Sequence, residues 1–192
     1  MSRYNQWYNY TYEEILNIAQ WNNFDIDIEK KIVCIFSWMP CAIMNISHSG
    51  KGENKVTKAQ KYDLKTTKEK IISVKSSADY FSGKKLIETD IKKESVKSEI
   101  IKLSEPLVEI LGTVGASKFL HFSFPLFFIM WDRKIRTHFK LPDDNIGYYS
   151  YLLNTIEELK KPEIVKIANE KYSKNLLRGL DIYRMEIIGE QE

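Results

Sequence analysis

The sequence predicts a mostly α-helical protein, a compact bundle of about eight helices in a single domain over residues 1–192, arranged in one lobe or two. Apolar residues recur at spacings of three and four along most of the chain, whereas the alternation typical of strands is weak. Only 8 Gly and 5 Pro occur in 192 residues, fewer than the turns of a β-sandwich or barrel require. Hydrophobic residues make up 43% of the chain, which is enough for a continuous core.

The N-terminal third is expected to contain two helices and the clearest loop of the chain. A capping box, Thr-Tyr-Glu-Glu, predicts a short helix over residues 11–21. Asp25 or Asp27 can cap a second helix, on which apolar residues recur over residues 28–39. Residues 45–56 contain two Gly, several small polar residues and no apolar periodicity, which predicts a loop within the domain.

The next segment is rich in lysine. Residues 51–75 carry eight Lys against three acidic residues, which is typical either of a solvated face or of a DNA-facing surface. We expect a helix over residues 58–73 with Ile71 and Ile72 turned inward, and the β-branched residues allow short strands within 71–82 as the alternative. The remaining helices are expected over residues 84–102, 107–111, 116–122, 133–139, 147–160 and 163–187.

Charge and composition narrow the function only slightly. The formal net charge of +3 neither demands nor excludes nucleic acid. Cys34 and Cys41 read as small core residues, and neither they nor the three His have the spacing of a metal site, so we expect no metal and no cofactor. The N-terminal residues do not resemble a signal peptide and the apolar runs are too short to span a bilayer, so we expect a cytoplasmic protein without a membrane partner.

One segment carries a chemical signal. Gly112-Thr-Val-Gly115 predicts a turn between two short helices, which together would form a helix-hairpin-helix near residues 106–122. Ala116 follows the turn, and Asp132 lies sixteen residues after it, preceded by apolar residues and followed by a basic helix. Over these residues the chain resembles the helix-hairpin-helix DNA glycosylase superfamily, which includes endonuclease III-like and 8-oxoguanine glycosylases.

The resemblance, which covers residues 110–139, implies a DNA-binding protein that acts in base excision. In that family the glycine turn binds duplex phosphates through backbone N–H groups, because glycine lets the backbone approach closely and a helix N-terminus favours an anion. An aspartate stabilises positive charge that develops on the deoxyribose of a flipped-out nucleotide. Asp132 would be this catalytic carboxylate, and the amides near Ala116 and Ser117 would contribute to the phosphate site.

The segment also departs from the family pattern. In members that cleave the strand, a Lys lies two residues before the Ala, and here that position is Val114, which cannot form a Schiff base. Lys118 lies four residues further on and is expected on a different face of the helix. The pattern therefore predicts a monofunctional glycosylase in which Asp132 positions water. The same segment is similar to uncharacterised prokaryotic proteins with an Ala-Ser-Lys-x-Leu-His-Phe…Trp-Asp pattern, which assigns no activity.

Basic residues around the turn favour DNA as the partner. Residues 112–140 contain five basic residues against Asp132 alone, and such an excess suits phosphate contact. The residues expected to contact DNA are Gly112, Gly115, Ala116, Ser117, Lys118, Arg133, Lys134 and Arg136. His121 and Trp131 are the candidates for a pocket that holds the base.

Each of these assignments has a structural alternative. Asp132 can be no more than the N-cap of the basic helix. His121 can be a hydrogen-bonded core histidine, and Trp131 can be a core residue. The functional alternative is accordingly a catalytically inert helical module that binds nucleic acid or a protein partner. The sequence does not determine the oligomeric state.

Overall fold

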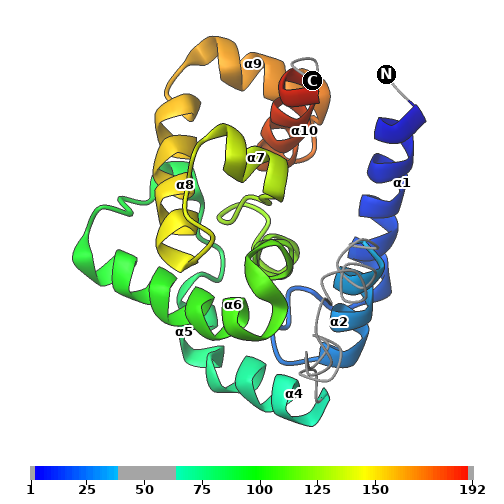
Figure 1. Cartoon of the computed structure of the whole chain (residues 1–192), viewed down its shortest axis with the longest axis vertical. Helices are drawn as coiled ribbons and strands as arrows, with labels where there is room; N and C mark the ends of the chain where they lie inside the picture. Colours follow the sequence, from blue (N-terminus) through cyan, green and yellow to red (C-terminus); the bar gives the residue numbers. More distant parts are fainter. Residues whose placement is uncertain (1–2, 39–63, 190–192) are drawn as a thin grey trace, which may run out of the picture.

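The computed structural model describes residues 3–38 and 64–189 (Figure 1). All regular elements in these two ranges are helical and neither range contains a strand, which confirms the predicted fold class. The elements are α1 (Arg3–Ile18), α2 (Ile28–Ser37), α4 (Leu64–Ser73), α5 (Lys75–Tyr80), the 3-10 helix η2 (Leu86–Glu88), α6 (Glu94–Ser123), α7 (Arg133–His138), α8 (Asn145–Leu159), α9 (Pro162–Lys171) and α10 (Leu176–Gly189). Cys41 and the predicted loop 45–56 lie outside the described residues.

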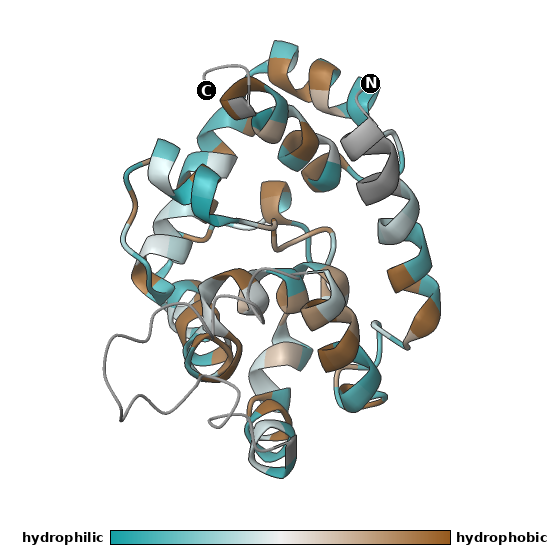
Figure 2. Ribbon diagram, turned by 45° about the vertical axis from the view of Figure 1, so that its right-hand side comes forward, coloured by the Kyte–Doolittle hydropathy of each residue, from teal (hydrophilic) through white to brown (hydrophobic). Residues whose placement is uncertain are grey.

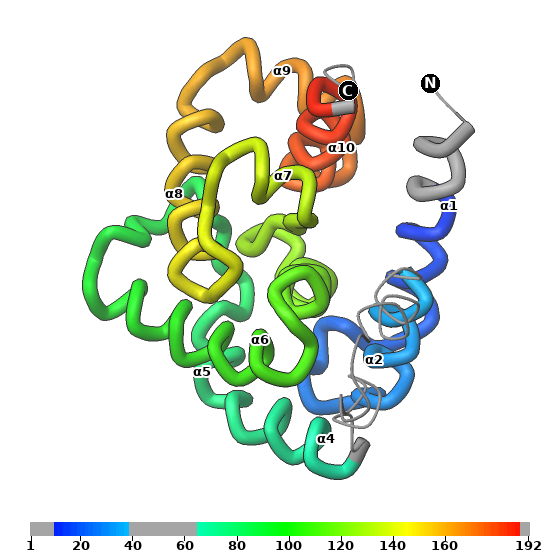
Figure 3. The backbone as a smooth tube through the Cα atoms, viewed as in Figure 1, coloured from blue at the N-terminus to red at the C-terminus, as the bar shows by residue number. Residues whose placement is uncertain are grey.

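The long helix α6 occupies the middle of the molecule, between α1 and α2 on one side and α8 to α10 on the other (Figure 1). Its direction changes sharply at Gly112, whose φ of 70° and ψ of 168° are not helical (Figure 3). The predicted four-residue turn is therefore wrong in extent, because Gly112 alone leaves the helix and Gly115 lies buried inside its second half. The structure shows a bent helix, and a helix-hairpin-helix stays a prediction.

Two expected helix starts are wrong. α1 begins at Arg3, so Thr11 lies within the helix and is not its cap; its Oγ1 accepts a hydrogen bond from Trp38 Nε1 at 2.9 Å. The helix expected over residues 84–102 begins only at Glu94. The backbone N–H of Leu86 donates instead to Leu126 O at 2.9 Å, a long-range bond that takes the preceding stretch out of a helical path.

The helix expected over residues 163–187 is two helices. α9 ends at Lys171, and Asn175 caps α10 by accepting a hydrogen bond from Arg178 N at 3.0 Å. The two helices approach so closely that a Cβ at Gly179 would lie 1.9 Å from Ala168 O. The chain turns back here because a residue without a side chain permits this contact.

The segment 71–82, for which strands were an alternative, belongs mainly to α4 and α5. Ile71 is buried as expected, whereas Ile72 is exposed because it lies on the outer face of α4. Apolar and polar residues alternate around most of the helices (Figure 2), as expected for helices that each bury one face. No helix in the described ranges is both long and apolar enough to cross a membrane.

An apolar connector, residues 124–131, joins α6 to α7 and crosses the core. Phe127, Phe128 and Ile129 are fully buried, so their carbonyl groups need partners away from water. Tyrosines of α8 bind two carbonyl groups of the connector, since Tyr148 Oη donates to Ile129 O at 2.8 Å and Tyr151 Oη donates to Met130 O at 3.2 Å. The connector therefore ends at a defined place, immediately before Asp132.

A wholly buried lysine shapes the connection between α1 and α2. Lys31 Nζ donates to Asn23 O at 2.6 Å and to Phe24 O at 3.3 Å, and it lies 5.6 Å from the centroid of the Trp21 ring. Asp27 precedes α2 in a left-handed conformation, with φ of 55°, and its side chain makes no capping hydrogen bond. The predicted aspartate cap of α2 is thus wrong, because the Asp27 carboxylate pairs with Lys30 at 3.0 Å.

Candidate functional site

Asp132 stands at the N-terminus of α7, as the sequence predicts. Its Oδ1 accepts a hydrogen bond from Ile135 N at 2.9 Å, which confirms the N-cap. The side chain is half-buried, and its second carboxylate oxygen, Oδ2, takes no part in the capping hydrogen bond. Arg133 and Lys134 follow on the exposed surface of α7. The capping hydrogen bond thus fixes the carboxylate at the N-terminus of a helix whose first turn carries basic side chains.

Lys118 lies on the second half of α6 and is half-buried. Its Nζ donates to Trp38 O at 3.0 Å and lies 4.9 Å from the centroid of the Trp38 ring. Burial lowers the pKa of Lys118 to about 8, with Asp181 and Asp132 acting to raise it and Arg178 to lower it. Lys118 therefore lies within electrostatic range of Asp132. It follows Val114 by four residues in one helical segment, so it lies on the same face as the position of the missing catalytic lysine, and the expectation of a different face is wrong.

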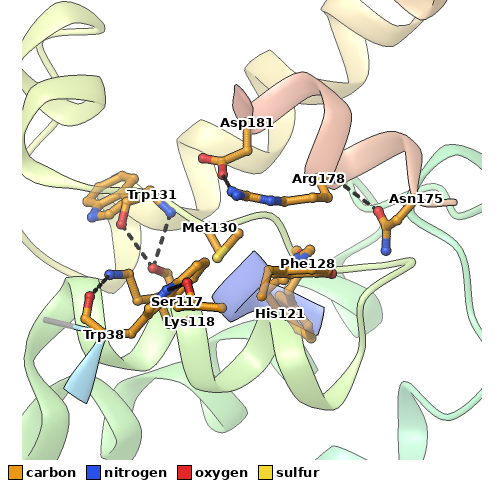
Figure 4. Close-up of polar contacts among 12 residues, drawn as sticks. Trp38, Ser117, Lys118, His121, Phe128, Met130, Trp131, Asn175, Arg178 and Asp181 are labelled. Carbon is orange, nitrogen blue, oxygen red and sulfur yellow. Dashed lines mark hydrogen bonds and ion pairs between the residues drawn. The ribbon is translucent and has the colours of Figure 1, made fainter. Parts of the chain in front are cut away.

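Two residues of α10, which the sequence alone did not indicate, lie in the same group of charged side chains as Lys118 and Asp132. Arg178 Nη1 pairs with Asp181 Oδ2 at 2.5 Å, and both side chains are less than 10% exposed. The guanidinium carbon of Arg178 lies 5.0 Å from the centroid of the Tyr12 ring and 5.6 Å from that of Trp38. Figure 4 shows the pair above the connector and Lys118 below it. An i, i+3 pair of opposite charges on a largely apolar helix was the available signal.

The charges of this cluster act on one another. Burial raises the pKa of Asp181, Arg178 opposes that change, and Asp132 adds to it. The cluster contains two cations and two anions, so it is electrically balanced when all four groups are charged. We name these four residues, Lys118, Asp132, Arg178 and Asp181, the charge cluster.

His121 has the properties of a structural histidine. It is fully buried, and its Nδ1 lies 2.7 Å from Phe128 O, which can only accept, so Nδ1 carries the proton. Nε2 then accepts from Tyr12 Oη at 2.9 Å. Burial lowers the pKa of His121 to about 3, against the hydrogen bond to Phe128 O, so the ring is neutral at physiological pH. A base pocket that involves His121 and the equally buried Trp131 stays a prediction.

The residues of the predicted phosphate site divide into two groups. Gly115, Ala116 and Ser117 are buried in the second half of α6, whereas Gly112 is half-buried at the bend. Ser117 Oγ donates to Trp131 O at 3.1 Å and accepts from Trp131 N at 3.2 Å, so it anchors the connector to α6. The bend at Gly112 is the part of this segment that reaches the surface.

Asp143 joins the bend of α6 to α7. Thr113 Oγ1 donates to Asp143 Oδ1 at 2.5 Å, and the other carboxylate oxygen of Asp143 forms an ion pair with Arg136. Arg136 was expected to contact DNA, and its charge is compensated within the protein. The neighbouring Asp144 caps α8 by accepting a 2.7 Å hydrogen bond from Gly147 N.

The described residues contain no group of three or more His, Cys, Asp or Glu side chains with the arrangement of a metal site. No family model, no curated protein and no solved structure matches this chain. The likeness to the glycosylase superfamily therefore rests on the residues of the chain itself.

Proposed function

We propose that this protein binds DNA and removes a base from it as a monofunctional glycosylase, with Asp132 as the catalytic carboxylate. The observation that supports the proposal is the half-buried Asp132 side chain, fixed by Ile135 N and accompanied by the Lys118 ammonium group. A carboxylate held in this way stabilises positive charge on a sugar without having to reorganise, and its uncapped oxygen can orient water.

The surface next to Asp132 supports DNA as the partner. Arg133 and Lys134 are exposed in the first turn of α7, and the bend at Gly112 is tied to the same helix through Asp143. Basic side chains bind phosphates and position the duplex, whereas a carboxylate beside them acts on one nucleotide. Val114 cannot form an imine, so base release without strand cleavage is the expected reaction.

The test compares Asp132→Asn with Asp144→Asn. Both residues cap a helix through Oδ1, and Asn retains a capping oxygen, so both variants should fold. Base release is measured on a panel of duplex oligonucleotides that each carry one altered base. D132N should lower the rate by more than about 100-fold with unchanged DNA affinity, and D144N should leave both unchanged. Equal activity of D132N and wild type would end the catalytic assignment, and strand cleavage would contradict a monofunctional reaction.

A second candidate is an inert module that binds nucleic acid without releasing a base. It is favoured by the capping bond of Asp132 and by the burial of His121 and Trp131, which account for these residues structurally. Arg133→Gln should weaken DNA binding a few-fold and lower the slope of log affinity against log salt by about 0.9. Arg136→Gln is the control, since Asp143 already neutralises Arg136. Binding with these properties and no product on any duplex would select this candidate.

A further inference from the structure

We propose that Asp181, paired with Arg178 on α10, is a positioning residue that keeps Lys118 in place as a cation beside Asp132. This role of Asp181 concerns the same site as the proposed function, and only its consequence for DNA binding rests on that function. It makes α10 a part of the site, although the resemblance to glycosylases ends before α8.

The geometry starts from a shared aromatic ring. Lys118 Nζ and the guanidinium carbon of Arg178 lie 4.9 Å and 5.6 Å from the centroid of the Trp38 ring. Two cations at one ring repel each other unless anions accompany them. Asp181 is bound to Arg178 at 2.5 Å, so the second cation is neutralised where it approaches the first (Figure 4).

Hydrogen bonds at the start of α10 also hold the backbone of Arg178 in position. Its backbone N–H donates to the capping oxygen of Asn175 at 3.0 Å, and Asn175 Nδ2 donates to Pro125 O at 2.9 Å. The start of α10 is therefore attached to the connector that leads to Asp132. These two hydrogen bonds join the start of α10, which carries Arg178 and Asp181, to the chain just after α6.

The charged groups that act on Lys118 come from two elements besides its own. α10 contributes Asp181 and Arg178, and the residue before α7 contributes Asp132. Trp38, at the end of α2, contributes a carbonyl oxygen. Burial favours the neutral amine, and the two carboxylates oppose that effect. Without Asp181, the Arg178 charge would add to the effect of burial and Lys118 would lose its proton more easily.

In the proposed site, the positive charge of Lys118 therefore depends on residues of α10. Lys118 remains charged at neutral pH and loses its charge as the pH rises through about 8. A DNA-binding surface that includes this ammonium group should lose affinity over the same range. Replacement of Lys118 by Arg, which keeps its charge at all accessible pH values, should remove that dependence.

The direct test follows the lysine 13Cε resonances of the labelled full-length chain as a function of pH. K118R identifies the Lys118 signal, and Lys31, whose pKa burial also lowers to about 8, is the internal control. D181N should lower the Lys118 midpoint by about one pH unit, and R178M should raise it by a smaller amount, because Arg178 acts on Lys118 less strongly than Asp181 does. Lys31 should be unchanged in both, because neither α10 residue is among the groups that act on it.

Opposite shifts at Lys118 with a constant Lys31 support the proposal. An unchanged Lys118 midpoint in either folded variant overturns it, as does a wild-type midpoint below pH 7. If neither single variant folds, R178M/D181L replaces the buried pair with apolar side chains, an exchange that proteins often tolerate. It should lower the Lys118 midpoint, because Asp181 acts on Lys118 more strongly than Arg178 does, and an unchanged midpoint there also overturns the proposal.

DNA affinity between pH 6.5 and 9 separates the two proposals. Affinity that falls through about pH 8 in wild type and stays constant in K118R supports both. If the NMR shifts appear as expected but no duplex binds at low salt, the positioning role of Asp181 stands and the DNA-binding function fails.

Discussion

Lys31 and Lys118 have the same type of surroundings and yet belong to different kinds of site. Each ammonium group lies beside a tryptophan ring and donates to backbone carbonyl oxygens, and burial lowers both pKa values to about 8. Lys31 is fully buried and serves two carbonyl groups of one loop. Lys118 is half-buried, binds one carbonyl group and faces the charges of α7 and α10.

The difference teaches that a lowered lysine pKa does not by itself mark a functional site. At Lys31 the ammonium group donates to two carbonyl groups of the adjacent loop, and the carboxylates that act on it, Asp25 and Asp27, each pair with another lysine, so its role is complete within the fold. At Lys118 the neighbours are groups with chemistry of their own, among them Asp132. The features that distinguish the two lysines are partial exposure and the nature of their partners.

The largest expected effect is on the pH dependence of stability, and it concerns His121, which lies one helical turn from Lys118 on α6. Its folded pKa of about 3 lies below its unfolded value, so the unfolded chain binds more protons between about pH 3 and 6.5. Stability should therefore fall as the pH decreases through this range, by roughly 4 kcal/mol from His121 alone. Urea unfolding against pH measures the loss, and His121→Gln, which does not titrate, should show a smaller one. Parallel pH profiles for the two proteins would show that His121 is not held neutral.

The second effect separates the lysines directly. Lys31→Met leaves the carbonyl groups of Asn23 and Phe24 without their donor in the core, and we expect a loss of about 3 kcal/mol. Lys118→Met loses one such bond at a half-buried position and should cost about 1 kcal/mol. Chemical denaturation of both variants gives the comparison. Equal losses would mean that Lys118 is as structural as Lys31.

The third effect concerns alkaline pH. Both lysines have folded pKa values below their unfolded ones, so the unfolded chain binds more protons between about pH 8 and 10. Stability should rise over this range, with about 2 kcal/mol coming from the fully buried Lys31. Above pH 10 the raised pKa of buried Tyr148 acts in the opposite direction, because the folded state then holds the extra proton. The rise should be smaller in Lys31→Met, where only Lys118 still contributes, and a rise of unchanged size there would contradict this origin.

The last effect compares two glycines with similar positive φ angles. Gly112 and Gly83 have φ values of 70° and 71°, and a Cβ at either would meet nothing within 4 Å. Alanine should cost about 1 kcal/mol at Gly83 and about 1–3 kcal/mol at Gly112, whose ψ of 168° is confined almost to glycine, through backbone strain alone. Only Gly112→Ala should also weaken DNA binding, because only Gly112 lies at the proposed phosphate-binding bend. Equal DNA affinity of both variants would remove the bend from the interface.

Local interactions account for the predictions that the structure confirms. The cap at Asp132 joins the carboxylate to the N–H group three residues later, so the sequence contains both partners close together, and the cap at Asp144 has the same form. The end of the helix expected over residues 116–122 is equally local, because Pro125 follows α6 closely and a proline disfavours helix in the residue before it. The Thr11 cap failed for a related reason: the pattern was present, but the helix around it began earlier.

By itself the sequence determined the helical class, the acid at the start of α7 and the basic residues behind it, because spacing and capping act over one or two helical turns. Tertiary structure alone decided where α6 begins, through the bond from Leu86 N to Leu126 O, and which groups surround Lys118. Lys118 donates to a carbonyl group 80 residues earlier in the chain, and its carboxylate partners arrive from later helices. Such neighbours follow from how the helices pack, and helix packing depends on the whole core at once.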